Sequence, residues 1–276
     1  MVRFAKILPH EDTNTPIVVQ GITVAYDGHH ALDNVSFTLA PGERVAVVGP
    51  NGAGKSTLFK VMAGLLPPTS GSVSLFGGAP ERHICVAYVP QRSEVDLSFP
   101  VTVRDVVLMG RVGKLGLFRW PGRADRRLVE ECLALVGMTD LAERQIGELS
   151  GGQQQRVFIA QALAQEAQVM LLDEPFTGLD VNSQEDILAI LEMLRRRKVT
   201  VLVSTHDLNQ AAHYFDRVLL LNHRLISFGP PAEVLTAQHL NQAYGEQLRL
   251  VETAEGVMAF SDTCCEGGQE PHEPNR

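Results

Sequence analysis

The sequence predicts an α/β fold with a parallel sheet at its core, an N-terminal antiparallel β-subdomain and an inserted helical subdomain. Two observations indicate the parallel sheet. Residues 44–48 form a short apolar run that leads into a glycine-rich segment and then into a helical pattern. Strand-like runs at residues 169–172 and 199–204 flank a helix with one apolar face, formed by Ile187, Ile190, Leu191 and Leu194. Such a strand–helix–strand order implies parallel strands joined by right-handed crossovers.

The β-subdomain is predicted from alternation near the N-terminus. Apolar and polar residues alternate over residues 17–26 and 35–39, with the turn signal Asp27-Gly28 between them. The pattern changes to helices and loops between Gln91 and Gln155, so we expect the helical subdomain at about residues 92–157. The other elements expected are helices at 55–63, from Thr102 to Met109, around 128–135 and at 153–165, strands at 72–76 and 84–89, a closing hairpin at 217–221 and 224–228, and a helical segment ending near 244.

We expect one domain over residues 15–250, followed by an acidic tail at residues 251–276. Six acids in the tail face only Arg276, and several Gly and Pro residues are added, which predicts disorder. The formal net charge of −8 argues against a nucleic-acid-binding surface. No apolar run approaches the ~18 residues that span a bilayer, and no secretory signal is evident. We therefore expect a cytosolic protein that meets the membrane through a partner.

The cysteines indicate a reduced protein. Cys85 and Cys132 lie among apolar residues and are expected to be small core residues. Cys264 and Cys265 lie in the acidic tail, and their spacing matches no familiar metal-ligand pattern. We therefore expect no structural disulfides.

Residues 49–56 predict a phosphate-binding loop. Glycines let backbone N–H groups converge on phosphate oxygens, and the N-terminus of the following helix adds a favourable dipole. Lys55 is expected to reach the β- and γ-phosphates of a nucleoside triphosphate, and the Ser56 hydroxyl to ligate Mg²⁺. The residues expected to bind the nucleotide here are Gly49, Pro50, Asn51, Gly52, Ala53, Gly54, Lys55, Ser56 and Thr57.

Two acids, Asp173 and Glu174, follow the apolar run at residues 169–172. A buried strand delivers such carboxylates to the carboxyl edge of the sheet, where ligands bind in open α/β sheets. Asp173 is suited to hold Mg²⁺, and Glu174 to accept a proton from an attacking water. An isolated Asp-Glu pair could also be a helix cap or a turn, but the phosphate loop upstream favours the catalytic interpretation.

The pentapeptide Leu149-Ser150-Gly151-Gly152-Gln153 completes the pattern. With it, residues 17 to 244 resemble the ATP-binding-cassette (ABC) ATPases, the motor subunits of ABC transporters. The resemblance implies ATP and Mg²⁺ as cofactors and a dimer of two copies of the chain. In that dimer the ATP of one copy would be contacted by the pentapeptide of the other, through Ser150, Gly151, Gly152 and Gln153.

The same resemblance assigns single residues that would otherwise pass for packing, loop or capping residues. It implies that Tyr26 stacks on adenine and that Gln91 senses Mg²⁺ and the γ-phosphate. It implies that Asp180 lies on a loop crossing the dimer interface and that His206 contacts the γ-phosphate. The implied catalytic residues are Glu174, His206, Lys55 and Gln91, and the implied metal ligands are Ser56, Gln91 and Asp173.

The stretch from Gln91 to Arg111 is similar to cassettes of bacterial importers for manganese, zinc or ferrous iron. The likeness is carried by the Ser-Phe-Pro-Val-Thr-Val core at 98–103 and by Met109-Gly110-Arg111. It implies an integral membrane permease as partner, a position at the cytoplasmic face of the cell membrane, and an extracytoplasmic substrate-binding protein acting indirectly. The alternatives are importers of iron–siderophore, haem or cobalamin, a soluble ABC ATPase without a permease, and a lipid or drug exporter. No nucleic-acid partner is expected.

Overall fold

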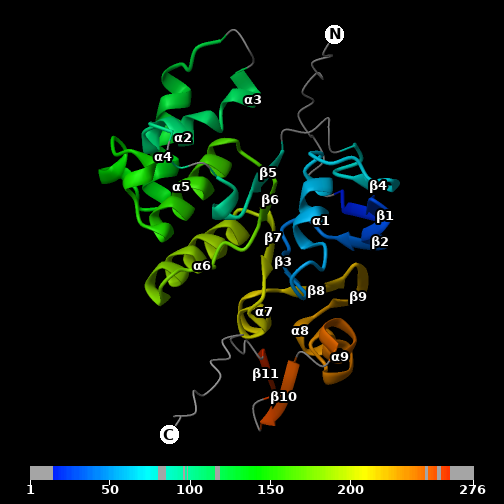
Figure 1. Ribbon diagram of the computed structural model, residues 1–276. Helices are drawn as coiled ribbons and strands as arrows, with labels where there is room; N and C mark the ends of the chain where they lie inside the picture. The colour runs from blue at the N-terminus through cyan, green and yellow to red at the C-terminus, as the bar shows by residue number, and fades with distance from the viewer. Residues whose placement is uncertain are drawn as a thin grey trace, which may run out of the picture.

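The computed structural model describes residues 15–79, 85–95, 97, 99–115, 119–245, 248–253 and 256–261. Figure 1 shows a central set of strands with the helical subdomain on one side and a small antiparallel sheet with α1 on the other. The predicted α/β fold is confirmed, and each of its three parts has a separate role in positioning the site.

The central sheet has the strand order β5-β6-β7-β3-β8-β9. The pairs from β5 to β8 are parallel, and β9 joins β8 as an antiparallel hairpin. Alternate residues of β3 enter two different cores: Val45 and Val47 pack toward the β-subdomain, whereas Ala46 and Val48 pack toward the helices. The strands are β3 (Arg44–Val48), β5 (Val86–Val89), β6 (Val169–Leu172), β7 (Thr200–Thr205), β8 (Arg217–Asn222) and β9 (Arg224–Gly229).

The N-terminal sheet has the order β2-β1-β4, with both pairs antiparallel. It covers helix α1 (Lys55–Met62), whose Leu58 and Phe59 share a core with Ile17 and Ile22. The third strand ends at Ser74, short of the predicted 76, because Phe76 adopts a left-handed backbone with φ 48° and opens a turn. The strands are β1 (Ile17–Tyr26), β2 (His29–Leu39) and β4 (Ser70–Ser74).

The helical subdomain packs α2 and α4 against α5. The predicted capping box opens α2, because the Thr102 side chain accepts from Asp105 N and the Asp105 carboxylate accepts from Thr102 N. Its elements are η2 (Arg92–Glu94), α2 (Val103–Met109), α3 (Val112–Leu115), α4 (Arg123–Leu135), η3 (Thr139–Leu141), η4 (Ile146–Glu148) and α5 (Gly151–Ala164). Helix α6 (Val181–Arg196) then leads from the β6 edge to β7.

The C-terminal part differs from the expectation in one respect. After α7 (Leu208–Tyr214), α8 (Pro231–Val234) and α9 (Ala237–Tyr244), the chain forms an antiparallel hairpin of β10 (Leu248–Thr253) and β11 (Gly256–Ser261). Disorder was expected from residue 251, but residues 257–260 are Val, Met, Ala and Phe, types that suit a strand. Cys264, Cys265 and the remaining tail lie outside the described residues.

Candidate functional site

The phosphate loop connects β3 to α1 at the carboxyl edge of the sheet, and two of its glycines are required by close contacts. A Cβ on Gly49 would lie 2.0 Å from the carbonyl oxygen of Leu221 in β8. A Cβ on Gly54 would lie 2.4 Å from the carbonyl oxygen of Ala31, and its φ of 96° is also left-handed. The loop is therefore held between β2 and β8, and any side chain at these positions would displace it.

Lys55 begins α1, and its ammonium lies within the loop. The Nζ atom donates to the carbonyl oxygens of Gly49 at 2.7 Å and Pro50 at 3.0 Å. Burial lowers the pKa of Lys55, and the nearby carboxylates of Glu174 and Asp173 oppose that shift. A cation and a helix N-terminus thus face the same loop, which is the charge arrangement that binds phosphate.

The acid pair follows β6 as predicted. Asp173 is buried, and its carboxylate accepts from Ser204 Oγ at 2.5 Å and Tyr88 OH at 3.3 Å. Burial and then the charge of Asp173 raise the pKa of Tyr88, so the phenol stays protonated and can donate. Glu174 Oε2 accepts from Gln91 Nε2 at 3.3 Å and from Thr177 Oγ1 at 3.1 Å.

The Glu174 backbone is in the left-handed region, with φ 46°. A non-glycine residue in this region is strained by about 1–3 kcal/mol, and such residues cluster at functional sites. The turn directs the chain away from β6 at the residue that was predicted to act as the base.

Gln91 and His206 converge on Glu174 from the ends of two other strands. Gln91 lies two residues beyond the end of β5 and donates to the Glu174 carboxylate. The exposed His206 directly follows β7, and with Glu174 it lines a cavity of about 200 Å³. The structure therefore places Gln91 and His206 near Glu174, whose charge also acts on Lys55.

Tyr26 ends β1, and its ring is half-exposed. It pairs with His29 at the start of β2, the strand that two residues later presents Ala31 to the phosphate loop. This places an accessible aromatic ring on the same side of the molecule as the loop, which is compatible with the predicted stacking.

The pentapeptide residues form the start of α5. Ser150 is the N-cap: its Oγ accepts from Gln153 N at 3.4 Å, and Gln153 Oε1 accepts from Ser150 N at 3.0 Å. A Cβ on Gly152 would lie 2.4 Å from Ser183 Oγ in α6, so only glycine allows this approach of the two helices. Gly151 borders a cavity of about 410 Å³ that Gln91 and Glu174 also line.

Asp180 caps α6, and both of its carboxylate oxygens are engaged by Ser183. Oδ1 accepts from Ser183 N at 2.9 Å and Oδ2 accepts from Ser183 Oγ at 2.8 Å. The backbone N–H bond from Ser183 is the largest cause lowering the Asp180 pKa. Within one chain this side chain is a helix cap, and its predicted role across a dimer interface stays a prediction.

Three residues of the site, Tyr88, Thr177 and Ser204, were not predicted to contact the acid pair. Ser204 could have been found from strand register, because Leu172 of β6 lies opposite Val203 of β7, and the next residues are Asp173 and Ser204. The register of two strands 31 residues apart is decided by tertiary packing, which the sequence pattern alone did not give.

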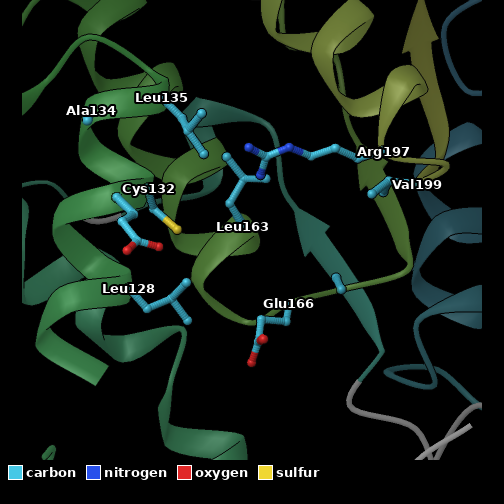
Figure 2. A pocket seen from close by; sticks show the side chains of 10 residues that line it. Leu128, Cys132, Ala134, Leu135, Leu163, Glu166, Arg197 and Val199 are labelled. Atoms are coloured by element: carbon cyan, nitrogen blue, oxygen red, sulfur yellow. The ribbon is translucent and has the colours of Figure 1, made fainter. Parts of the chain in front are cut away.

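A larger cavity, of about 670 Å³, lies apart from these residues, between α4, the end of α5 and the segment before β7. Figure 2 shows mostly aliphatic side chains around it, with the Arg197 side chain reaching toward Leu163 and Leu135; the other charged lining residues are Glu131 and Glu166. Cys132 also lines it, and burial raises the pKa of this thiol to about 11, so the sulfur stays protonated and unreactive. Cys85 is likewise buried and free, as predicted.

The phosphate loop, the adjacent acid pair and the position of His206 define a nucleoside triphosphatase of the phosphate-loop class. The model of the ABC transporter family matches residues 32–177, more than half of the chain. The chain therefore belongs to the ABC transporter family and is an ATP-binding subunit with ATPase activity.

Its relatives agree with this assignment. The manganese transport system ATP-binding protein MntB of Halalkalibacterium halodurans is 47% identical over 90% of this chain and 99% of its own length. The zinc transport system ATP-binding protein TroB of Treponema pallidum is 47% identical over 84% of this chain and 88% of its own. A dimeric ATP-binding cassette in a post-hydrolysis state, bound to ADP and phosphate, is 29% identical and superimposes with a TM-score of 0.68 over 78% of this chain and 98% of that one.

Proposed function

We propose that this chain is the ATP-hydrolysing motor of an importer for divalent transition metal ions, with manganese or zinc ahead of ferrous iron. One observation supports the cargo: relatives named for manganese and for zinc transport match this chain at 47% identity along most of their length. Among the residues described, no helix is long and apolar enough to cross a membrane. The proposal includes a separate permease on whose cytoplasmic face the chain sits, and an extracytoplasmic protein that delivers the ion, since the relatives are named as ATP-binding proteins of transport systems.

Two copies of the chain would act together. The α5 N-terminus of one copy, capped by Ser150, would face the ATP held by the phosphate loop of the other. A 14-residue helix presents unpaired N–H groups and a positive dipole end, both of which suit a γ-phosphate. Binding of two ATP molecules would close the dimer and hydrolysis would release it, so phosphate chemistry becomes a closing and opening motion.

Mg²⁺ is proposed to accompany the ATP, held by Ser56, Gln91 and Asp173. These side chains offer the oxygen ligands that Mg²⁺ prefers. The buried Asp173 carboxylate receives its side-chain hydrogen bonds from neutral hydroxyls, which leave its negative charge available to a cation. A bound Mg²⁺ would neutralise charge on the β- and γ-phosphates.

The loop after Gln91 is the proposed contact with the permease. Gln91 donates to Glu174 at its inner end, and Phe99 lies near its outer end with 64% of its surface exposed. A permease that contacts this exposed apolar side chain would be connected to the nucleotide site through the short segment between Phe99 and Gln91, whose side-chain amide donates to Glu174.

Replacement of Phe99 by Asp tests both the cargo and the contact. Cells that lack the native gene would receive wild type or F99D, and manganese, zinc and iron accumulation would be measured by mass spectrometry. We expect lost metal uptake while the purified chain keeps its ATPase rate. L65D is the matched control, because Leu65 is 65% exposed on the side of the β-subdomain. If siderophore or haem uptake depends on the chain and metal ion uptake does not, the proposed metal-ion cargo is wrong. If no permease co-purifies with the chain, a soluble ABC ATPase is favoured.

A further inference from the structure

Ser204 is a fully buried residue of β7 whose hydroxyl contacts both acids of the site. Its Oγ lies 2.5 Å from Asp173 Oδ1 and 2.8 Å from the backbone nitrogen of Glu174. The roles of the atoms follow from their chemistry. The Glu174 N–H can only donate, so Oγ accepts from it, and the hydroxyl proton is then available to the Asp173 carboxylate.

The hydroxyl continues the sheet where the backbone no longer can. The β6–β7 ladder reaches the pair Leu172 and Val203, and Asp173 N still donates to Val89 O of β5 at 2.9 Å. At Glu174 the left-handed turn takes the chain out of the ladder. Ser204 supplies a side-chain acceptor for the N–H group that this turn would otherwise leave without a ladder partner.

We propose that Ser204 is a positioning residue for ATP hydrolysis. One hydroxyl fixes the Asp173 carboxylate and the Glu174 backbone relative to each other. It also ties both to β7, the strand that His206 directly follows. The Glu174 carboxylate accepts from Gln91 and Thr177, which both lie in loops. The hydrogen bond from Glu174 N–H to Ser204 is the contact that joins this residue to a strand, so we infer that it fixes the position of the base. The proposal rests on the ATPase activity and is independent of the cargo.

The test is steady-state ATPase kinetics of the purified full chain carrying S204A. A small displacement of a catalytic group lowers turnover by roughly 10–100-fold, and we expect kcat to fall by that factor. KM for ATP should stay unchanged, because Lys55 and the phosphate loop keep their contacts. ATP binding measured by calorimetry should be as tight as in the wild type.

T200V is the matched control, because Thr200 is another fully buried hydroxyl of β7. Its Oγ1 accepts from Gly42 N at 2.8 Å, at the opposite end of the strand from the acid pair. Valine keeps the shape of threonine, so T200V removes a hydroxyl hydrogen bond of the same strand at a site away from the acid pair. We expect T200V to lower the melting temperature, as S204A does, yet to keep kcat.

The conservative variant S204T restores a hydroxyl at the same atom position and should recover most of the lost kcat. Wild-type kcat in S204A would overturn the proposal. So would a kcat loss of similar size in S204A and T200V, since that would be the effect of general destabilisation. If S204T is too crowded to fold, as a melting curve would reveal, the comparison of S204A with T200V still decides the question.

Discussion

Arg111 joins three helices, and its replacement gives the sharpest stability prediction. Its Nε donates to Asp125 Oδ1 at 3.0 Å, near the start of α4, and its Nη1 donates to Ala164 O at 2.8 Å, at the end of α5. Nη1 also contacts Glu166 at 2.7 Å. The preceding Gly110 allows the approach, since a Cβ there would lie 2.2 Å from Gln161 O. Residues 109–111 therefore connect the end of α2 to α5, the helix that Ser150 caps.

The loss of unfolding free energy expected for R111M follows from the burial of the groups that Arg111 contacts. The side chains of Arg111 and Asp125 are only 12% and 14% exposed. Methionine keeps the apolar length but removes every donor, so a helix-end carbonyl and a shielded carboxylate lose their charged partner. Asp125 keeps its hydrogen bond from Gly122 N, but the loss of a charged partner from shielded groups still costs about 1–3 kcal/mol of unfolding free energy. Glu166 is half-exposed and keeps Lys114, so it adds little. The melting temperature should fall by roughly 2–10 °C.

Thermal unfolding followed by circular dichroism at neutral pH measures this loss. R127M is the control, because the Arg127–Glu131 pair is 83% and 55% exposed and should contribute under ~1 kcal/mol. Equal melting temperatures for R111M and R127M would refute the reasoning.

The contacts of Arg111 with Asp125 and Glu166 also predict that the stabilising effect of Arg111 depends on pH. The Gly122 N–H bond and then Arg111 lower the pKa of Asp125. Burial raises the pKa of Glu166, but bonds from Lys114 and Arg111 outweigh it, and the net shift is downward. A lowered pKa in the folded state stabilises the fold above the unfolded value of about 4, and this contribution is lost as the pH falls through the folded value. The difference between wild type and R111M should therefore shrink below about pH 4.

Two further predictions concern hydrolysis. E174Q should bind ATP normally but turn over ~10²–10⁴-fold more slowly, since it lacks a carboxylate to accept the proton. The variant should remain an ATP-bound dimer, which gel filtration with ATP would detect. Near-normal hydrolysis would disprove Glu174 as the base. S150R should keep ATP binding to the isolated chain and lose hydrolysis, because the bulky cation would block the partner's phosphate. Activity that survives S150R and does not depend on protein concentration would contradict a site shared between two copies.

The sequence by itself determined the parts of this protein that depend on local backbone requirements. Gly49 and Gly54 are needed where a side chain would meet a backbone carbonyl, and this requirement is visible as a motif between a strand and a helix. The acids after β6 were predictable because a parallel strand delivers its last residues to the ligand-binding edge. The capping box of α2 was predictable because its partners are three residues apart.

Only the tertiary structure decided the contacts between residues far apart in the chain. Ser204 meets Asp173 through strand register, and Arg111 meets Ala164 through helix packing, at separations of 31 and 53 residues. The hairpin of β10 and β11 was missed because the acids of the tail outweighed its short apolar run. Pairing of β10 with β11 gives such a run a backbone partner, and that energy depends on the register of two strands, which composition does not record.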